Sequence, residues 1–260
     1  MNRLNNSSVP ALELINVRKD FGALTILRDI HLQLQQGERL ALIGPNGAGK
    51  STLFNLVSGR LVPHSGNIFL LGHAIAGKKP YQINRLGLAR SFQVTHLFPD
   101  LSVWDNLRCS VMWSQGGGYS FWQRLSRITS VSARAEEVML QIGLETRRNV
   151  MAGALSYAEQ RALEIGVTIA GGARVILLDE PTAGMSRAES DAAIALIQRA
   201  TQGCALLMVE HDMNVVFGLA DRIAVLVQGE LIACDTPENI RANQHVQQAY
   251  LGDLILDEVS

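Results

Sequence analysis

The chain has 260 residues, which is enough for one or two domains with a sizeable buried core. Hydrophobic residues make up 47% of it, and this fraction excludes a disordered chain. The 24 acidic residues nearly cancel the 23 basic ones, leaving a formal charge of -1 that argues against bulk electrostatic binding to nucleic acid or anionic lipid.

The three cysteines are odd in number and far apart, so neither a disulfide framework nor a zinc site is indicated, and a reducing compartment is expected. The first ten residues form a polar tail that lacks the apolar core of a signal peptide. Nowhere do about 18 apolar residues follow one another without interruption, as a membrane-spanning helix requires. Residues 12–17 predict an edge strand, and residues 39–44 predict a buried strand that ends in a glycine-rich turn.

The glycine-rich turn carries the strongest signal in the chain. It matches the pattern GxxxxGK(S/T) with Gly44, Pro45, Asn46, Gly47, Ala48, Gly49, Lys50 and Ser51. Glycines let backbone N–H groups converge on phosphate oxygens, and the helix predicted from Thr52 to Val57 adds partial positive charge. Lys50 suits the β- and γ-phosphates and the Ser51 hydroxyl suits Mg²⁺. A turn that merely reverses the chain is the alternative, and the strand–loop–helix context disfavours it.

Beyond this loop, Ser65-Gly66 opens a short strand over 67–71, and residues 98–154 have the helical spacing of an inserted subdomain. A helix is predicted after Ser156, ending at Gly171-Gly172, and another after Ser186. Apolar strands are predicted over 174–178, 205–209 and 222–227. Continuously apolar strands that alternate with helices predict a mostly parallel sheet covered on both faces.

Two carboxylates, Asp179 and Glu180, come at the end of the strand over 174–178. Ligands bind at the carboxyl ends of strands in parallel α/β sheets. Asp179 therefore suits a Mg²⁺ shell, and Glu180 suits a group that orients or deprotonates an attacking water. Two solvated acids at a strand end are the alternative for an isolated Asp-Glu pair.

A six-residue segment before this strand distinguishes among the families that share the phosphate loop. It reads Leu155-Ser156-Tyr157-Ala158-Glu159-Gln160, and here the sequence resembles the ATP-binding subunits of ABC transporters, whose signature occupies this position. Further matches follow in family order: Phe21 at the adenine-stacking aromatic, Gln93 in the glutamine loop, Met185-Ser186 in the D-loop, and His211 at the switch histidine. The resemblance runs from Leu12 to Leu251. It implies an α/β P-loop NTPase core with a mostly parallel sheet, an antiparallel N-terminal β part and an inserted α-helical subdomain.

The resemblance also implies ATP and Mg²⁺ as cofactors. Residues 44–52 with Phe21 would bind the nucleotide. The metal ligands would be Ser51, Gln93 and Asp179, and the catalytic residues Lys50, Gln93, Glu180 and His211. Ser156, Ala158 and Glu159 would meet the γ-phosphate held by the opposite subunit, so that one chain contains half of each of two composite sites.

Each of these residues also has a purely structural interpretation. The serines with their following glutamates, Ser156 with Glu159 and Ser186 with Glu189, form capping boxes. Taken alone, Phe21 would be a core aromatic, Gln93 a polar strand end and His211 a surface histidine. Two residues depart from the family pattern: Ala158 replaces the signature glycine, which could weaken ATP-driven closure, and Ser186 replaces the D-loop aspartate.

Shorter segments, among them Ser91-Phe92-Gln93, Leu97-Phe98-Pro99 and residues 246–252, resemble the ATP-binding subunits of branched-chain amino acid importers, a group that includes urea and related amide transporters. The implied organisation is a tail over 1–10, an ATP-binding core over 11–92 and 159–235, a helical signature subdomain over 93–158 and a helical extension over 236–260.

The implied partners are a second, identical or distinct ATP-binding subunit, integral membrane permeases and, indirectly, a periplasmic solute-binding protein, with no nucleic acid. The expected location is peripheral, on the cytoplasmic face of the inner membrane. Three tryptophans, Trp104, Trp113 and Trp122, fall in the helical subdomain with Phe98 and Phe121. They are interpreted as core, with a groove for a membrane subunit as the alternative. The alternative functions are a soluble ABC ATPase acting on nucleic acid or ribosomes and a regulatory subunit with impaired turnover.

Overall fold

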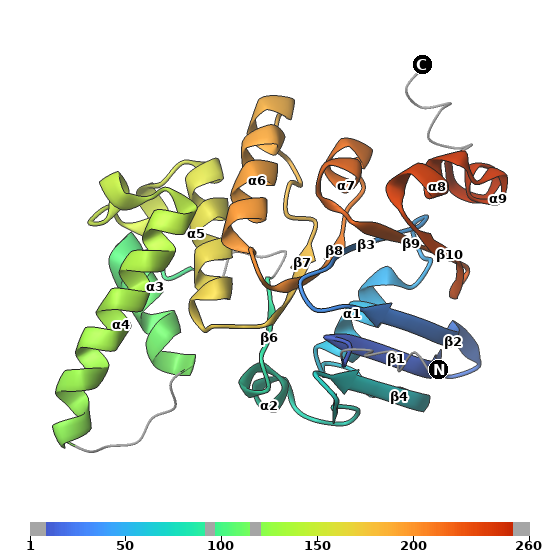
Figure 1. Cartoon of the computed structure of the whole chain (residues 1–260), viewed down its shortest axis with the longest axis horizontal. Coiled ribbons are helices and arrows are strands. Elements are labelled where there is room, and N and C mark those ends of the chain that lie inside the picture. Colours follow the sequence, from blue (N-terminus) through green and yellow to red (C-terminus); the bar gives the residue numbers. More distant parts are fainter. Residues whose placement is uncertain (1–8, 92–96, 115–120, 252–260) are drawn as a thin grey trace, which may run out of the picture. The chain divides into compact units, whose positions relative to one another are not determined.

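The computed structural model describes residues 9–91, 97–114 and 121–251, with the backbone alone for residues 114, 121–128 and 250–251. The chain divides into two compact units whose elements are labelled in Figure 1. Unit 1 consists of Met1–Leu86, Gly203–Val209 and Ala220–Ser260, and unit 2 of Gly87–Gln202 and Glu210–Leu219. Each unit is therefore assembled from segments that are distant in the sequence.

Unit 1 contains two groups of strands. An antiparallel sheet has the order β2-β1-β4-β5. In the second group β3 lies between β8 and β9 and is parallel to both, while β10 pairs antiparallel with β9. The strands are β1 Leu12–Phe21, β2 Leu24–Leu34, β3 Arg39–Ile43, β4 Ser65–Leu70, β5 His73–Ala74, β8 Ala205–Val209, β9 Arg222–Val227 and β10 Glu230–Asp235.

The prediction of an edge strand at residues 12–17 is wrong, because β1 lies between β2 and β4. Its alternate residues Leu12 and Leu14 are buried and stand opposite Leu34 and Leu32 of β2. Strand β2, which the sequence reading missed, occupies the edge. From Ile30 to Leu34 its residues alternate between buried and exposed, as a half-buried edge strand requires.

The parallel strands of unit 1 confirm the apolar-run predictions. All five residues of β8 are buried, and in β3 only Arg39 is partly exposed. Ala41 stands opposite both Met208 and Ile223, so β3 has a buried partner on either side. The helices of unit 1 are α1 Lys50–Val57, α2 Pro80–Arg85, α8 Pro237–Ala242, α9 Gln244–Val246 and a π turn at Gln247–Leu251.

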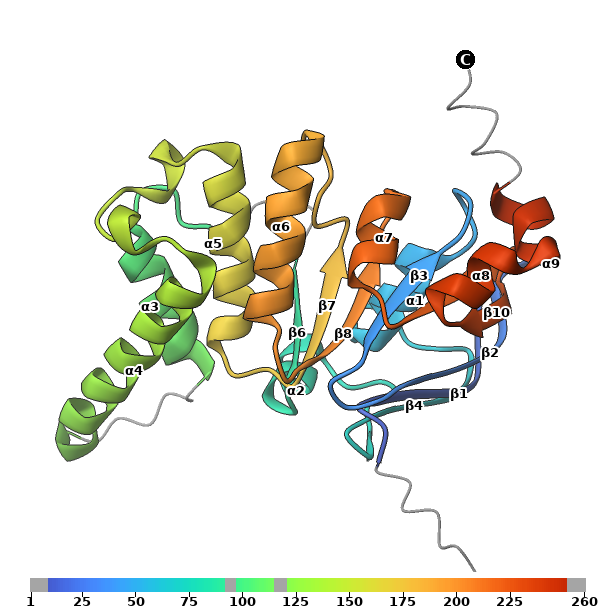
Figure 2. The same ribbon diagram turned by 45° about the horizontal axis from the view of Figure 1, so that its top comes forward.

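Unit 2 combines a parallel strand pair with helices. Strand β6 (Leu88–Arg90) pairs with β7 (Val175–Asp179). Helix α5 packs against α3, α4 and α6, and its place beside α6 is visible in Figure 2. The helices are α3 Val103–Ser114, α4 Phe121–Ile142, α5 Tyr157–Ala170, α6 Arg187–Ala200 and α7 Met213–Leu219, with 3-10 turns at Glu145–Arg147 and Ala152–Ala154.

Both predicted capping boxes are present in unit 2. Ser156 caps α5 by accepting a hydrogen bond from the Glu159 N–H, and the Glu159 carboxylate accepts one from the Ser156 N–H. Ser186 and Glu189 repeat the arrangement at α6. The two helices therefore begin where the sequence indicated.

The loop that leads into α3 is held by a buried asparagine. Asn106 donates hydrogen bonds through Nδ2 to the carbonyl oxygens of Phe98, Leu101 and Ser102 at 3.0 to 3.2 Å. Its Oδ1 accepts a hydrogen bond from the Phe98 N–H at 2.9 Å. A single side chain thus satisfies four backbone groups of the loop.

We expect Asn106→Ala to lower the free energy of unfolding by about 2–3 kcal/mol, since it removes the partner of several backbone groups at a buried site. Urea denaturation would measure the change. Asn67→Ala is the matched control, because Asn67 is exposed on β4. Equal stability of the two variants would contradict the loop-holding role of Asn106.

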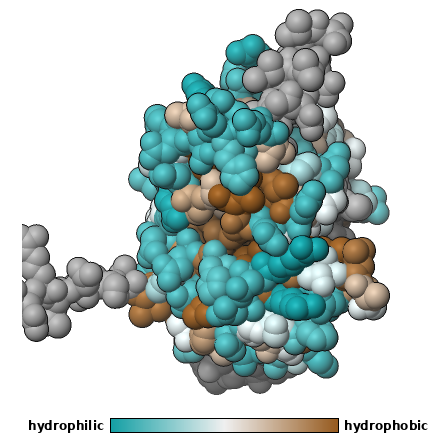
Figure 3. Space-filling model, turned by 90° about the vertical axis from the view of Figure 1, so that its right-hand side faces the viewer, coloured by the Kyte–Doolittle hydropathy of each residue, from teal (hydrophilic) through white to brown (hydrophobic). Residues whose placement is uncertain are grey.

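Hydrophobic residues also reach the surface. In the view of Figure 3 a hydrophobic patch lies between hydrophilic areas. The exposed large hydrophobic residues of unit 1 include Val9, Phe21, Leu24, Val62 and Tyr81.

In the described part of the chain, no helix has the length and apolar character needed to cross a membrane.

Candidate nucleotide site

The phosphate loop of unit 1 connects β3 to α1 and has the backbone that the motif requires. Gly47 and Gly49 have φ angles of 81° and 107°, in the region that favours glycine. A Cβ on Gly44 would lie 2.0 Å from the carbonyl oxygen of Leu226, so the loop passes directly against β9. Helix α1 has Gly49 as its N-cap residue and therefore no side-chain cap, and its first turn contains no acidic residue. Its N-terminal partial charge therefore suits an anion.

Lys50 bends back over this loop. Its Nζ donates hydrogen bonds to the carbonyl oxygens of Gly44, at 2.5 Å, and Pro45, at 3.0 Å. The lysine is buried, whereas Ser51, the next residue of α1, is exposed. The ammonium group is thus held against two carbonyl oxygens of the loop, and Ser51 is exposed in the first helical turn.

Phe21 ends β1 at the hairpin with β2, and its ring is 48% exposed. The same hairpin supports the phosphate loop, because a Cβ on Gly49 would lie 2.7 Å from Leu27 and 3.2 Å from the Ile26 carbonyl oxygen of β2. The Lys19 ammonium lies 5.1 Å from the centre of the Phe21 ring. The purely core interpretation of Phe21 is wrong, and an exposed ring face is what stacking on a base requires.

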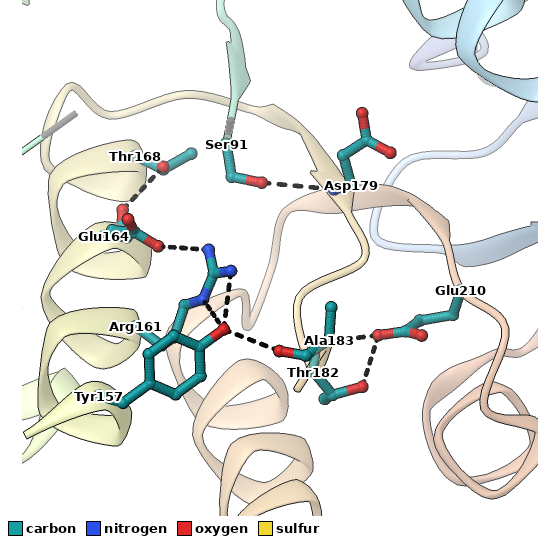
Figure 4. A network of polar contacts seen from close by, with 9 residues as sticks. All are labelled: Ser91, Tyr157, Arg161, Glu164, Thr168, Asp179, Thr182, Ala183 and Glu210. Carbon is teal, nitrogen blue, oxygen red and sulfur yellow. Dashed lines mark hydrogen bonds and ion pairs between the residues drawn. The ribbon is translucent and has the colours of Figure 1, made fainter. Parts of the chain in front are cut away.

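In unit 2, Asp179 ends β7 and is almost fully buried. Its Oδ2 accepts a hydrogen bond at 3.0 Å from Arg90, the last residue of β6. Its backbone N–H donates to the Ser91 hydroxyl at 3.4 Å (Figure 4). Arg90 was not anticipated from the sequence. Gln93, the remaining metal-ligand candidate, lies outside the described residues.

Glu180 and His211 lie together in unit 2. Glu180 Oε1 and His211 Nε2 are 3.0 Å apart, and both side chains are partly exposed. The backbone of Glu180 has a φ of 49°, a left-handed conformation that is rare for a residue with a Cβ. Such backbone conformations gather at functional sites. The structure thus joins two residues that the sequence analysis named separately.

Another acid, Glu210, was missed by the sequence analysis. It precedes His211, is only 3% exposed, and accepts hydrogen bonds from Thr182 and from the His211 N–H. The sequence does contain a signal for Glu210, because this acid follows the apolar run of β8 as Asp179 follows the apolar run of β7.

The loop of Thr182 and Ala183 is also held by Tyr157, whose hydroxyl donates to the Ala183 carbonyl at 2.8 Å (Figure 4).

The start of α5 has a defined charge state. Hydrogen bonding from the Ser156 N–H, followed by the hydrogen bond and charge of Arg147, lowers the pKa of the Glu159 carboxyl. Arg147 Nε lies 2.7 Å from Glu159 Oε1. The Ser156 hydroxyl is exposed, with its oxygen accepting from the Glu159 N–H. The Ser156 side chain also hydrogen-bonds to the Glu159 carboxylate, which lowers the pKa of that carboxyl further.

Comparison with known proteins adds the family. A family model described as "ABC transporter" matches residues 27–183, and one described as "Branched-chain amino acid ATP-binding cassette transporter" matches residues 230–253. The chain belongs to the ABC transporter ATP-binding family. It is therefore an ATPase, and the similarity to the branched-chain amino acid group is confirmed.

Relatives match nearly the whole chain. The high-affinity branched-chain amino acid transport ATP-binding protein BraF of Pseudomonas aeruginosa is 35% identical over 255 residues, covering 95% of this chain and 99% of BraF. The corresponding protein LivG of Escherichia coli K12 is 36% identical over 256 residues, again covering 95% and 99%. A nucleotide-free ATP-binding cassette from an ABC transporter superposes with a TM-score of 0.77 at 25% identity, covering 93% of this chain and 98% of that one.

The two departures from the ABC pattern are structurally mild. Ala158 lies in the first turn of α5 and does not have a left-handed backbone, so its Cβ introduces no strain there. Ser186 caps α6 and donates from its hydroxyl to Glu189 at 2.7 Å. Neither residue distorts the helix that begins beside it.

Proposed function

We propose that this ABC ATPase drives an importer for amino acids of the branched-chain type or for related small amides such as urea. The observation that carries the proposal is the match of nearly the whole chain to BraF and LivG together with the match of residues 230–253 to the branched-chain family model. The match of residues 27–183 to the general ABC transporter model does not distinguish one transport group from another. The additional C-terminal match supports membership of this transport group.

Uptake of labelled leucine, isoleucine, valine and urea, compared in cells with and without this chain, tests the solute class. We expect uptake of one of these solutes to be lost with the chain and restored by its re-expression. Loss of uptake of an unrelated solute, such as a sugar, with normal uptake of all four would overturn the proposed solute class.

Within the site, the phosphate loop binds ATP through Lys50 and its backbone N–H groups, and Phe21 stacks on the adenine. Ser51, Gln93 and Asp179 would hold Mg²⁺. The uncapped α1 terminus and the exposure of Ser51 support this assignment. When bound, the metal neutralises charge on the phosphates. Glu180 accepts the proton of the attacking water, and the 3.0 Å contact supports His211 as the group that holds the Glu180 carboxylate in place.

The chain works with other subunits. A second ATP-binding subunit, identical or distinct, meets the nucleotide of this chain through its signature helix. In return, the nucleotide of that partner is contacted by Ser156, Ala158 and Glu159 of this chain. Integral permeases complete the importer at the cytoplasmic face of the inner membrane, and a periplasmic binding protein delivers the solute. The N-terminus of α5, where Ser156 is exposed, supports the contact across the dimer.

Aromatic residues of unit 2 supply a candidate membrane-subunit contact. The core interpretation is wrong for Trp113 and Phe98, which are 77% and 57% exposed. Trp104 is half-buried, with the Arg148 guanidinium 3.6 Å from its ring centre. The side chains of Phe121 and Trp122 lie outside the described residues. Exposed aromatics are typical of partner-binding surfaces.

We expect Trp113→Ala to reduce solute uptake about tenfold or more, as loss of a central interface aromatic does, while ATP turnover of the separate ATPase subunits stays within twofold. Uptake and ATPase assays on the same preparation measure the two effects. Leu140→Ala, which removes another exposed apolar side chain of unit 2, is the control. Parallel loss of uptake and turnover in Trp113→Ala would contradict a role limited to the contact.

A steady-state ATPase assay with and without the permeases separates the alternatives. Stimulation by the permeases supports the importer subunit. Stimulation by nucleic acid or ribosomes instead would favour a soluble ABC ATPase. ATP binding without turnover in the assembled complex would favour a regulatory subunit.

A further inference from the structure

Glu210 is a deeply buried acid. Its contacts join the segment that carries Glu180 to the segment that carries His211. Its Oε1 accepts two hydrogen bonds from Thr182, one from the backbone N–H at 2.9 Å and one from the hydroxyl at 2.6 Å. Its Oε2 accepts a hydrogen bond from the His211 N–H at 3.0 Å. Figure 4 shows the carboxylate directed at Thr182. The side chain therefore links the loop two residues after Glu180 to the backbone of His211.

These bonds close a ring of contacts. Glu180 is joined through Pro181 to Thr182, Thr182 binds Glu210, and the neighbour of Glu210, His211, lies 3.0 Å from Glu180. We propose that Glu210 is a positioning residue, which acts through this ring to hold Glu180 and His211 in contact. The inference rests on the roles proposed above for Glu180 and His211, and adds a residue to them.

The left-handed backbone of Glu180 supports this role. A residue with a Cβ keeps a φ of 49° only where the surrounding structure constrains it. Glu210 supplies such a constraint two residues away by fixing both the N–H and the hydroxyl of Thr182. Tyr157 supplies a second one by binding the next residue, Ala183. The loop is thus held from two directions.

The chemistry of the three donors specifies a carboxylate. A carboxylate offers two acceptor oxygens, whereas the amide of glutamine has one oxygen and one NH₂ group. The Thr182 N–H and the His211 N–H donate to different oxygens of the Glu210 carboxylate. In Glu210→Gln the NH₂ group replaces one of these oxygens and therefore faces one of the two N–H groups. At least one N–H then loses its acceptor while the volume of the side chain is kept. The variant is therefore a selective test of the link.

The experiment uses the full-length chain assembled with its partner subunits. We expect Glu210→Gln to lower kcat for ATP about 10- to 100-fold, as small displacements of catalytic groups do, with KM within about threefold of the unaltered protein. In the full-length chain labelled with ¹⁵N-histidine, the signal of His211 Nε2, assigned by its loss in His211→Asn, should shift. The matched control is Glu38→Gln, which changes another largely buried glutamate, in unit 1, that pairs with Arg222 and, among the described residues, has no contact with the loop of Thr182. It should leave kcat and the His211 signal unchanged.

Each outcome decides the inference. Should Glu210→Gln fail to fold, Thr182→Val removes a single hydroxyl donor, and we expect it to lower kcat about 3- to 10-fold with the same shift of the His211 signal. Unchanged kcat in the folded variant overturns the role of Glu210. Reduced kcat with an unmoved His211 signal, or an equal effect of Glu38→Gln, shows a merely structural contribution and also overturns it. If Glu180→Gln retains full turnover, the proposed roles of Glu180 and His211 fail instead.

Discussion

Glu180→Gln is expected to bind ATP normally and to hydrolyse it about 10² to 10⁴ times more slowly, the range over which loss of a general base acts. Glutamine has nearly the volume of glutamate and can keep a hydrogen bond to His211, which lies 3.0 Å from Glu180 Oε1. Its side chain has no carboxylate to accept the proton of a water. The substitution thus removes the base and leaves the surrounding geometry intact.

Phosphate release measures turnover and titration with a fluorescent ATP analogue measures affinity. Glu145→Gln, an exposed glutamate of unit 2, is the control and should retain both. Light scattering adds a test of the composite site, because a chain that binds ATP without hydrolysing it should accumulate as an ATP-bound dimer. Unaltered turnover in Glu180→Gln would refute its assignment as the base.

Lys50→Ala is expected to weaken ATP binding about 10- to 100-fold, since a hydrogen bond to a charged group contributes about 1.5–3 kcal/mol and 1.4 kcal/mol corresponds to a factor of ten. The structure adds a reason. The ammonium group is held at the loop by two carbonyl oxygens, so that its charge lies beside the backbone proposed to bind the phosphates. Turnover at low ATP should fall at least as far as the affinity does.

Lys50→Arg keeps the charge but replaces the compact ammonium by a planar guanidinium, and we expect it to restore only part of the affinity. Calorimetric titration with ATP gives the dissociation constants, and thermal melting shows whether each variant is folded. A folded Lys50→Ala chain with unaltered ATP affinity would show that the phosphate loop acts without its lysine.

The strands and helices that could be predicted are those with a strong local pattern. The apolar runs at 205–209 and 222–227 coincide with β8 and β9, and the capping serines coincide with the starts of α5 and α6. Strand β2 was missed because the alternation of apolar and polar residues along it is interrupted at Arg28 and Asp29, two consecutive charged residues. The position of β1 within its sheet depends on pairing with β2 and β4, and local pattern does not specify pairing.

Of the site residues, those that belong to a sequence motif could be named from the sequence. Those whose part in the site is visible only from their hydrogen bonds could not. Lys50, Asp179, Glu180 and His211 were named from spacing and resemblance, and their roles stay predictions. The bonds that organise them were not foreseen: Arg90 with Asp179, and Glu210 with Thr182. These pairs are 89 and 28 residues apart in the chain. No local rule indicates contacts over such separations.

Arg147 sets the net charge at the start of α5. Glu159 would by itself bring a full negative charge beside Ser156 and oppose an incoming polyphosphate. The guanidinium, 2.7 Å from Glu159, cancels this charge while the carboxylate continues to cap the helix. In the proposed dimer, the signature segment would thus keep an acid for folding without repelling the partner's nucleotide. We expect that tolerance of Glu159 in this position depends on Arg147, an arginine that no motif contains.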